Sequence, residues 1–295
     1  MRMFSILLLI AMGATSTLSP ARAEPWQAAR DAAPGVPGTE SWTFTSDFQT
    51  GDNKVEVLRP DPLTPGRRYP VVYVLPVNAG TQGAWGHPLE EARRFDLANR
   101  HQVILVTPSF PILPWFGDNP LEPLLRQNRH VSEAVVPFID ANYPTLATAR
   151  GRALVGFSKS ALGALQLYLL EPEKFGAAAV FENWWGVPDD KQWREWGFAT
   201  CYGTRETYDA LNPATLLARE RSTLITAGRP LAVLIGGPDA RLGTEALLMT
   251  LRQHRIPHTE LRDMAWGHTW KSPWLPPALA ALLPGPDGFG PPAER

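Results

Sequence analysis

The apolar residues of the chain gather into short continuous runs, separated by segments with helical spacing. The runs are rich in Val, Ile, Leu and Ala and are apolar at nearly every position, which is typical of buried strands in a parallel sheet covered on both faces. They predict strands at Tyr69–Val77, Gln102–Thr107, Ala153–Val155, Ala177–Phe181 and Leu231–Ile235, with a final short strand at His258–Leu261.

Helical patterns fill most of the gaps between these strands. They predict helices at Leu89–Asn99, Val131–Ile139, Lys159–Leu170, Gly243–Gln253 and Leu275–Leu283. The segment Asn183–Trp196 is rich in tryptophan and has no clean period. Short buried strands that alternate with helices predict an α/β fold, with a mostly parallel central sheet and helices on both faces.

The N-terminal part of the chain has a different pattern. Trp42–Thr45 and Lys54–Leu58 alternate between apolar and polar residues on either side of Gly51-Asp52-Asn53. Alternation around such a turn predicts an antiparallel hairpin.

The two ends of the chain lack the pattern of a packed core. Residues 1–23 combine Arg2, the apolar run Phe4–Met12 and Ala21-Arg22-Ala23, which is the pattern of a cleaved secretory signal peptide. An uncleaved amphipathic anchor is the alternative. We expect export to the periplasm or beyond, a flexible N-terminal arm over residues 24–38, a single domain over 39–284 and a disordered tail over 285–295.

Composition narrows the classes of function. The chain has 295 residues and a formal net charge of -1, which gives no electrostatic reason to expect a nucleic-acid partner. No further apolar run is long enough for stable membrane insertion. Cys201 is the only cysteine, and a packed or surface thiol is a better interpretation than a nucleophile. The histidines lack metal-ligand spacing and there is no glycine-rich phosphate loop, so we expect no metal and no cofactor.

One turn carries the main candidate chemistry. Gly156-Phe157-Ser158-Lys159-Ser160 lies between a predicted strand and a predicted helix, where a sharp turn presents a serine hydroxyl above the sheet. Small residues two before and two after the serine, here Gly156 and Ser160, suit such a turn. The alternative is an ordinary strand-to-helix loop with a helix-capping serine.

A serine nucleophile needs a base and an acid that orients the base. Asp239 follows the strand Leu231–Ile235 and His268 follows the last predicted strand, so the chain supplies Ser158, Asp239 and His268 in the order used by serine hydrolases on α/β sheets. Glu182, at the end of the strand after the serine helix, is the main rival of Asp239. Asp263 fits a surface charge better.

Acyl transfer also needs two N–H donors for the oxyanion. The backbone N–H of Lys159 provides one by its position, and we favour Asn78, in the loop after Tyr69–Val77, for the other. The Lys159 amine could instead act as the base of a Ser-Lys pair, although its place at the helix start directs it toward solvent.

The chain contains 11 tryptophans, and several fall in loops at the expected catalytic edge of the sheet. They could belong to the core, but we expect some of them to form an apolar wall of a substrate pocket. The expected wall residues are Trp115, Trp184, Trp185 and Trp266.

From about Arg68 to Trp274 the sequence resembles the α/β-hydrolase superfamily, and within it the esterase branch that includes esterase D, feruloyl and acetylxylan esterases and the mycolyltransferases. The resemblance is carried by Arg68–Leu75, Gly156–Ser160, Glu171–Ala177 and Gly267-His268 before Trp270. It implies the α/β-hydrolase fold, Ser158 as nucleophile, Asp239 as acid, His268 as base and a carboxylic-ester substrate. The chain departs from relatives at Pro76-Val77, where they usually have His-Gly, and at Ser160, where they have glycine.

These observations favour an exported serine esterase that acts through an acyl-enzyme on a small or polymer-linked ester. An acyltransferase or another triad hydrolase remains an alternative, and so does a non-catalytic binding protein on a hydrolase fold. The sequence does not indicate the oligomeric state.

Overall fold

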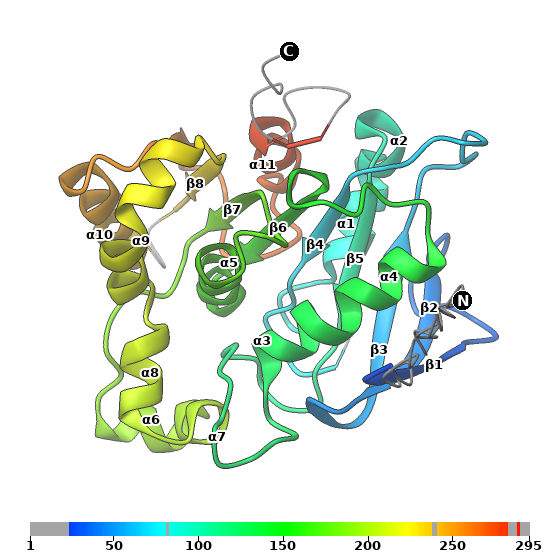
Figure 1. Ribbon diagram of the computed structural model, residues 1–295. Coiled ribbons are helices and arrows are strands. Elements are labelled where there is room, and N and C mark those ends of the chain that lie inside the picture. Colours follow the sequence, from blue (N-terminus) through cyan, green and yellow to red (C-terminus); the bar gives the residue numbers. More distant parts are fainter. Residues whose placement is uncertain (1–23, 81–82, 238–240, 283–287, 290–295) are drawn as a thin grey trace, which may run out of the picture.

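The computed structural model of the chain describes residues 24–80, 83–237, 241–282 and 288–289 (Figure 1). Within them, nine strands form one sheet in the order β1-β2-β3-β5-β4-β6-β7-β8-β9. The strands are β1 (Trp26–Arg30), β2 (Glu40–Ser46), β3 (Gln49–Leu58), β4 (Val71–Val74), β5 (Ile104–Pro108), β6 (Arg152–Phe157), β7 (Ala177–Phe181), β8 (Leu231–Ile235) and β9 (Thr259–Arg262).

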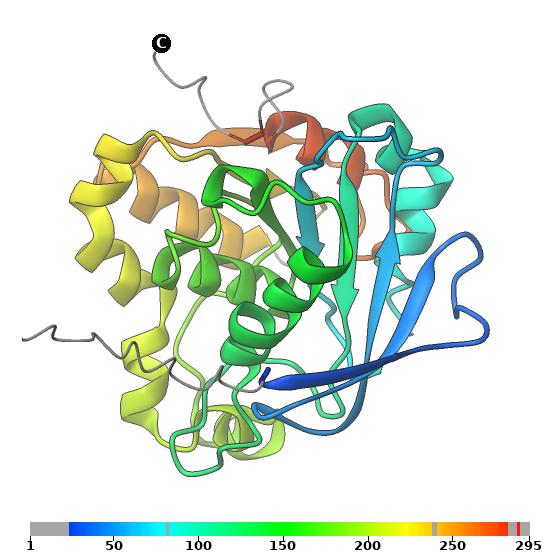
Figure 2. The same cartoon turned by 45° about the vertical axis from the view of Figure 1, so that its right-hand side comes forward.

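The sheet has the predicted division into a parallel and an antiparallel part. Strands β5, β4, β6, β7, β8 and β9 pair in parallel. Strands β1, β2 and β3 pair in antiparallel fashion, and β3 joins β5, so they form one edge of the sheet (Figure 2). The observed strands β7 and β8 have the bounds that the apolar runs predict.

Helices cover both faces of the sheet (Figure 1). Residues at alternate positions of the strands enter different cores: Tyr73 and Leu154 pack on the face covered by α4, α5, α9 and α10, whereas Val72 and Val155 pack on the face covered by α1, α2 and α11. The helices are α1 (Pro88–Arg94), α2 (Leu97–His101), α3 (Gln127–Arg129), α4 (Val136–Asn142), α5 (Lys159–Leu170), α6 (Asp190–Glu195), α7 (Phe198–Tyr202), α8 (Arg205–Leu211), α9 (Pro213–Ala227), α10 (Arg241–Gln253) and α11 (Leu275–Leu282). A π-helical turn at His130–Val135 joins α3 to α4.

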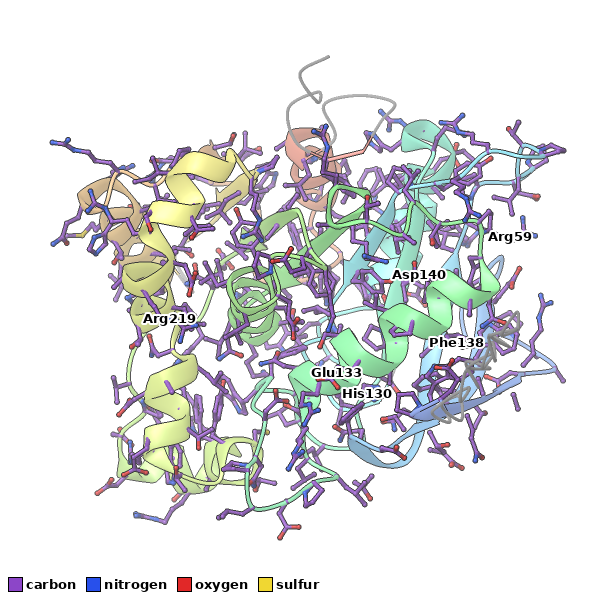
Figure 3. The ribbon with its side chains drawn as sticks, viewed as in Figure 1. Arg59, His130, Glu133, Phe138, Asp140 and Arg219 are labelled. Carbon is purple, nitrogen blue, oxygen red and sulfur yellow. The ribbon has the colours of Figure 1, made fainter. Side chains whose placement is uncertain are left out.

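The N-terminal segment differs from the expectation of a flexible arm over residues 24–38, because it contains strand β1. Trp26 stacks on Phe44 with ring centroids 6.1 Å apart and meets the edge of Phe138 at 5.1 Å. Phe138 projects from α4 toward these strands (Figure 3). After the strand, Asp31 accepts hydrogen bonds from Ser41, Thr43 and Lys54. Aromatic packing and these polar contacts therefore fix a segment that has little strand character of its own.

The C-terminal segment also differs in part from the expected disordered tail. Of residues 285–295 the structure describes Gly288 and Phe289, and Phe289 is buried in the core beside α11. Its N–H donates to the carbonyl of Arg150 at 2.7 Å. The proposed signal peptide, residues 1–23, lies outside the described residues.

Candidate active site

The serine stands on a strained turn between β6 and α5. Ser158 has φ 55° and ψ −119°, a conformation that non-glycine residues adopt only where the surrounding structure imposes it. Its N–H donates to the carbonyl of Phe181 on β7 at 3.0 Å. A side chain at Gly156 would place its Cβ 2.2 Å from the carbonyl oxygen of Ser160, so the turn requires glycine there. This geometry fits an exposed nucleophile better than a capping serine, since the Ser158 side chain makes no cap hydrogen bond to the helix.

His268 lies beside this turn and bonds to a buried carboxylate. Its Nδ1 is 2.6 Å from Oε2 of Glu182, a residue with 1% of its surface exposed. The imidazole packs on the Phe157 ring, which precedes Ser158, with centroids 4.5 Å apart. On its other side it meets the Trp85 ring at 5.2 Å. With the carboxylate on Nδ1, Nε2 is the ring nitrogen left to exchange protons.

Strand register explains why Ser158 and Glu182 lie at the same edge of the sheet. Phe157 on β6 and Phe181 on β7 are directly paired, so Ser158 and Glu182 each follow the last residue of neighbouring parallel strands. Carboxyl ends of parallel strands form one edge of the sheet, where α/β proteins place their sites. Glu182 also has a positive φ of 45°, as Ser158 does.

The sequence favoured Asp239 for the place behind the imidazole, with Glu182 as its rival. In the described part of the chain, Glu182 makes that hydrogen bond, and Asp239 lies outside the described residues. The order of residues along the chain fits both carboxylates. Only the pairing of β6 with β7 shows that Glu182 follows the strand next to the serine.

The expected oxyanion donors come from the helix that follows the serine and from the loop after β4. Lys159 is the first residue of α5, where backbone N–H groups have no partner within the helix. Asn78 is half-buried in the loop after β4, and this loop surrounds a cavity of about 10 Å³, the space of roughly one water molecule. The cavity is lined by Pro76, Val77, Asn78, Gly80, Gly83, Gly86, Pro88 and Trp270. Gly80 anchors the loop through an N–H that donates to Phe110 at 2.9 Å.

The four expected wall tryptophans divide among three surroundings. Trp115 and Trp184 contact each other edge to face at 5.6 Å. Trp266 instead packs in the core on the α11 face, and Trp185 packs against the core on the opposite face. Trp196 and Phe198, which the sequence did not single out, complete the group around Trp184. We call Trp115, Trp184, Trp196 and Phe198 the aromatic wall.

Two contacts join the aromatic wall to the turn that carries Ser158. The backbone N–H of Trp184 donates to the backbone carbonyl of Ser158 at 3.3 Å. The Nζ of Lys159 lies 5.7 Å from the centre of the Trp115 ring, and burial lowers the pKa of this amine. The Lys159 side chain is thus half-buried against the wall, and not directed into open solvent as expected.

The lone cysteine does not contribute to this site. Cys201 is buried and its thiol lies 3.4 Å from the carbonyl of Leu113. Burial raises the pKa of the thiol to about 11, which keeps it protonated at neutral pH. Among the described residues, no group of three or more His, Cys, Asp or Glu side chains could hold a metal ion.

Sequence comparison connects this site to known esterases. Residues 121–201, which include Ser158 and Glu182, match the family described as "Putative esterase". Esterase Rv1288 of Mycobacterium tuberculosis is 33% identical over 123 residues, a match that covers 38% of this chain and 25% of that protein. The chain therefore spans about a quarter of the length of this relative.

Solved structures agree on the fold. A ferulic acid esterase superposes with a TM-score of 0.65 at 18% identity, over 83% of this chain and 96% of that chain. FphF, a fluorophosphonate-binding serine hydrolase of Staphylococcus aureus, superposes with a TM-score of 0.66 at 13% identity, over 84% and 98%. The chain has the α/β-hydrolase fold, and its residues 121–201 are similar to the "Putative esterase" family. No helix in the described part of the chain has the length and apolar character of a membrane span.

Proposed function

We propose that the protein is a serine esterase that hydrolyses carboxylic esters through an acyl-enzyme, with Ser158 as nucleophile, His268 as base and Glu182 as the orienting acid. The observation that carries the proposal is the hydrogen bond between the buried Glu182 and the partly buried His268, beside a serine held on a strained strand-to-helix turn. The similarity to esterases supports the same reaction class.

In the proposed mechanism, Nε2 of His268 takes the hydroxyl proton of Ser158 while Oγ attacks the ester carbonyl. The Glu182 carboxylate stabilises the imidazolium that forms. Backbone N–H groups of Lys159 and Asn78 stabilise the negative charge on the carbonyl oxygen. The imidazolium then protonates the departing alcohol, and water, activated by the same imidazole, releases the acid from Ser158.

The direct test is ester hydrolysis by Ser158→Ala, compared with the wild type on a panel of phenyl esters. Removal of the nucleophile should lower kcat by about 10⁴-fold or more while the folded structure is retained, because triad members act as a unit. Circular dichroism and melting temperature serve as the folding control. Hydrolysis at the wild-type rate in the folded variant would exclude this mechanism.

A second candidate, a transferase with the same site, has a specific observation in its favour. Trp184 and Trp196 of the aromatic wall are not buried, so they offer an apolar surface near the serine on which an acceptor alcohol could compete with water. Product analysis with added alcohols separates the two: a transesterified product that increases with alcohol concentration would indicate transfer.

We also propose that the chain is exported after cleavage before Glu24. The support is the pattern of residues 1–23. Expression in a bacterial host, followed by intact mass measurement of the periplasmic fraction, should give a chain that begins at Glu24. A full-length chain confined to the cytoplasm would contradict the proposal.

A further inference from the structure

The side chain of Lys159 places a positive charge next to the proposed nucleophile. The residue directly follows Ser158, is half-buried, and its Nζ lies 5.7 Å from the centre of the Trp115 ring. Trp115 in turn packs on Trp184, whose backbone N–H donates to the backbone carbonyl of Ser158. The charge therefore lies against the aromatic wall, at the same edge of the sheet as the serine.

This charge has no carboxylate partner within the described residues. Burial alone accounts for the lowered pKa of its amine, with no contribution from an acidic neighbour. By contrast, Lys54, Lys174 and Lys191 each lie within 4.0 Å of a carboxylate. Two acidic side chains of α6 have other partners: Asp190 pairs with Arg205, and Glu195 pairs with Lys191.

A partly desolvated ammonium without a counter-charge is costly, because the water it loses is replaced only in part by the Trp115 ring. An anion that enters beside the ring would supply the missing partner. Hydrogen bonds to a charged group in such surroundings are stronger than those between neutral groups. Trp184 and Trp196, the two wall residues that are not buried, would contact the hydrocarbon part of the same molecule, so that apolar contact and charge recognition act on one ligand.

We propose that Lys159 is a specificity residue whose ammonium binds a carboxylate carried by the ester substrate, so that the site prefers esters with a free carboxylate over neutral esters of the same size. This inference rests on the proposed esterase function. It concerns only the side chain, because the backbone N–H of Lys159 has a separate proposed task at the oxyanion. The competing interpretation is that the amine only stabilises the fold through the Trp115 ring.

The test compares two pairs of esters, since the carboxylate could lie on the acyl or the alcohol side. Monophenyl adipate is paired with phenyl hexanoate, and 4-carboxyphenyl butyrate with phenyl butyrate. For the wild type, kcat/KM should favour the anionic member of at least one pair. This preference should weaken as ionic strength rises, because salt screens charge pairs near the surface.

In Lys159→Met the preference should fall by about tenfold or more, mainly through KM of the anionic ester, because a charged hydrogen bond is lost. Lys159→Arg should keep most of the preference for the anionic ester, because the guanidinium retains the positive charge. Lys191→Met, which removes an exposed lysine of α6, is the matched control and should keep the wild-type ratio. If Lys159→Met does not fold, Lys159→Gln takes its place.

The outcomes separate the inference from the function on which it rests. Equal turnover of both members of both pairs by the wild type would overturn the role of Lys159 and leave the esterase proposal intact. An equal loss on neutral and anionic esters in Lys159→Met would also overturn it, in favour of the purely structural interpretation. Absence of turnover of all four esters would contradict the proposed function itself.

Discussion

Ser160 lies two residues after Ser158, and its hydroxyl has a specific role in the turn. Its Oγ donates to the carbonyl of Phe157 and accepts from the N–H of the same residue, both at 2.9 Å. The side chain is fully buried. These two bonds satisfy backbone groups that the end of β6 would otherwise leave unpaired, directly before Ser158.

Replacement of this serine should therefore weaken the turn. Ser160→Ala leaves a buried N–H and a buried carbonyl without their partner, which should lower the free energy of unfolding by about 1–3 kcal/mol. Urea unfolding measures the change, and kcat on a neutral ester should fall as Ser158 loses its support. An unchanged unfolding midpoint would show that the two hydrogen bonds do not stabilise the turn.

The strands were predictable because each carries its signal locally. Runs such as Ala177–Phe181 are apolar throughout, which parallel strands buried on both faces require. Helices α6, α7 and α8 were not predicted, since each is too short to repeat an apolar period. Strand β1 was missed because its stability comes from α4, far along the chain.

The same distinction holds for the candidate site. The serine turn has a local signature, and His268 was singled out from its place after the last strand. The choice between Glu182 and Asp239 depends on which strands are neighbours, which residue order along the chain does not specify. The aromatic wall was only half predicted, because Trp266 and Trp185 face the two cores and not the serine edge.

Strand β1 offers a test at the level of a single element. Trp26→Ala removes a half-buried ring that packs on Phe44 and Phe138, and should lower the free energy of unfolding by about 2 kcal/mol. Gln27→Ala on the exposed side of the same strand is the matched control. Ester hydrolysis well below the melting temperature should not change in either variant. A loss of stability that is equal in both would contradict the assigned packing.

Across the whole molecule, the site assembles from segments that are distant in the sequence. Ser158 and Glu182 directly follow β6 and β7, His268 lies in the loop after β9, and the proposed oxyanion loop follows β4. The wall adds Trp115, from the loop after β5, and residues around α6 and α7. The helices α6–α8 lie together at the lower left of the molecule (Figure 1).

The stability of the whole fold should depend on pH through Asp118, in the loop before α3. Burial raises the pKa of this carboxyl to about 6. Hydrogen bonds from the backbone N–H groups of Arg129 and Asn128 lower the pKa, but by less than burial raises it. The folded state thus binds the proton more tightly than the unfolded chain. The stability that the protonated Asp118 carboxyl contributes is fully present below about pH 4 and is lost as pH rises through about 6.

Asp118→Asn should remove this loss of stability at rising pH, because the amide does not titrate. Between pH 4 and pH 7 the wild type should lose up to about 3 kcal/mol of unfolding free energy relative to the variant. Urea unfolding of both proteins at several pH values measures the difference. Parallel stability curves over this range would show that the Asp118 carboxyl does not titrate as assigned.

The central claim, that Ser158 is activated by His268 and Glu182, is tested most directly by a fluorophosphonate probe followed by peptide mass spectrometry. The probe should modify Ser158 of the wild type. The labelling rate should fall at least about 100-fold in His268→Ala, which removes the base. It should fall by a similar factor in Glu182→Gln, which removes the carboxylate that orients the base. Asp239→Asn should label at close to the wild-type rate. No adduct on the folded wild type, or loss of labelling in Asp239→Asn with retention in Glu182→Gln, would contradict the account.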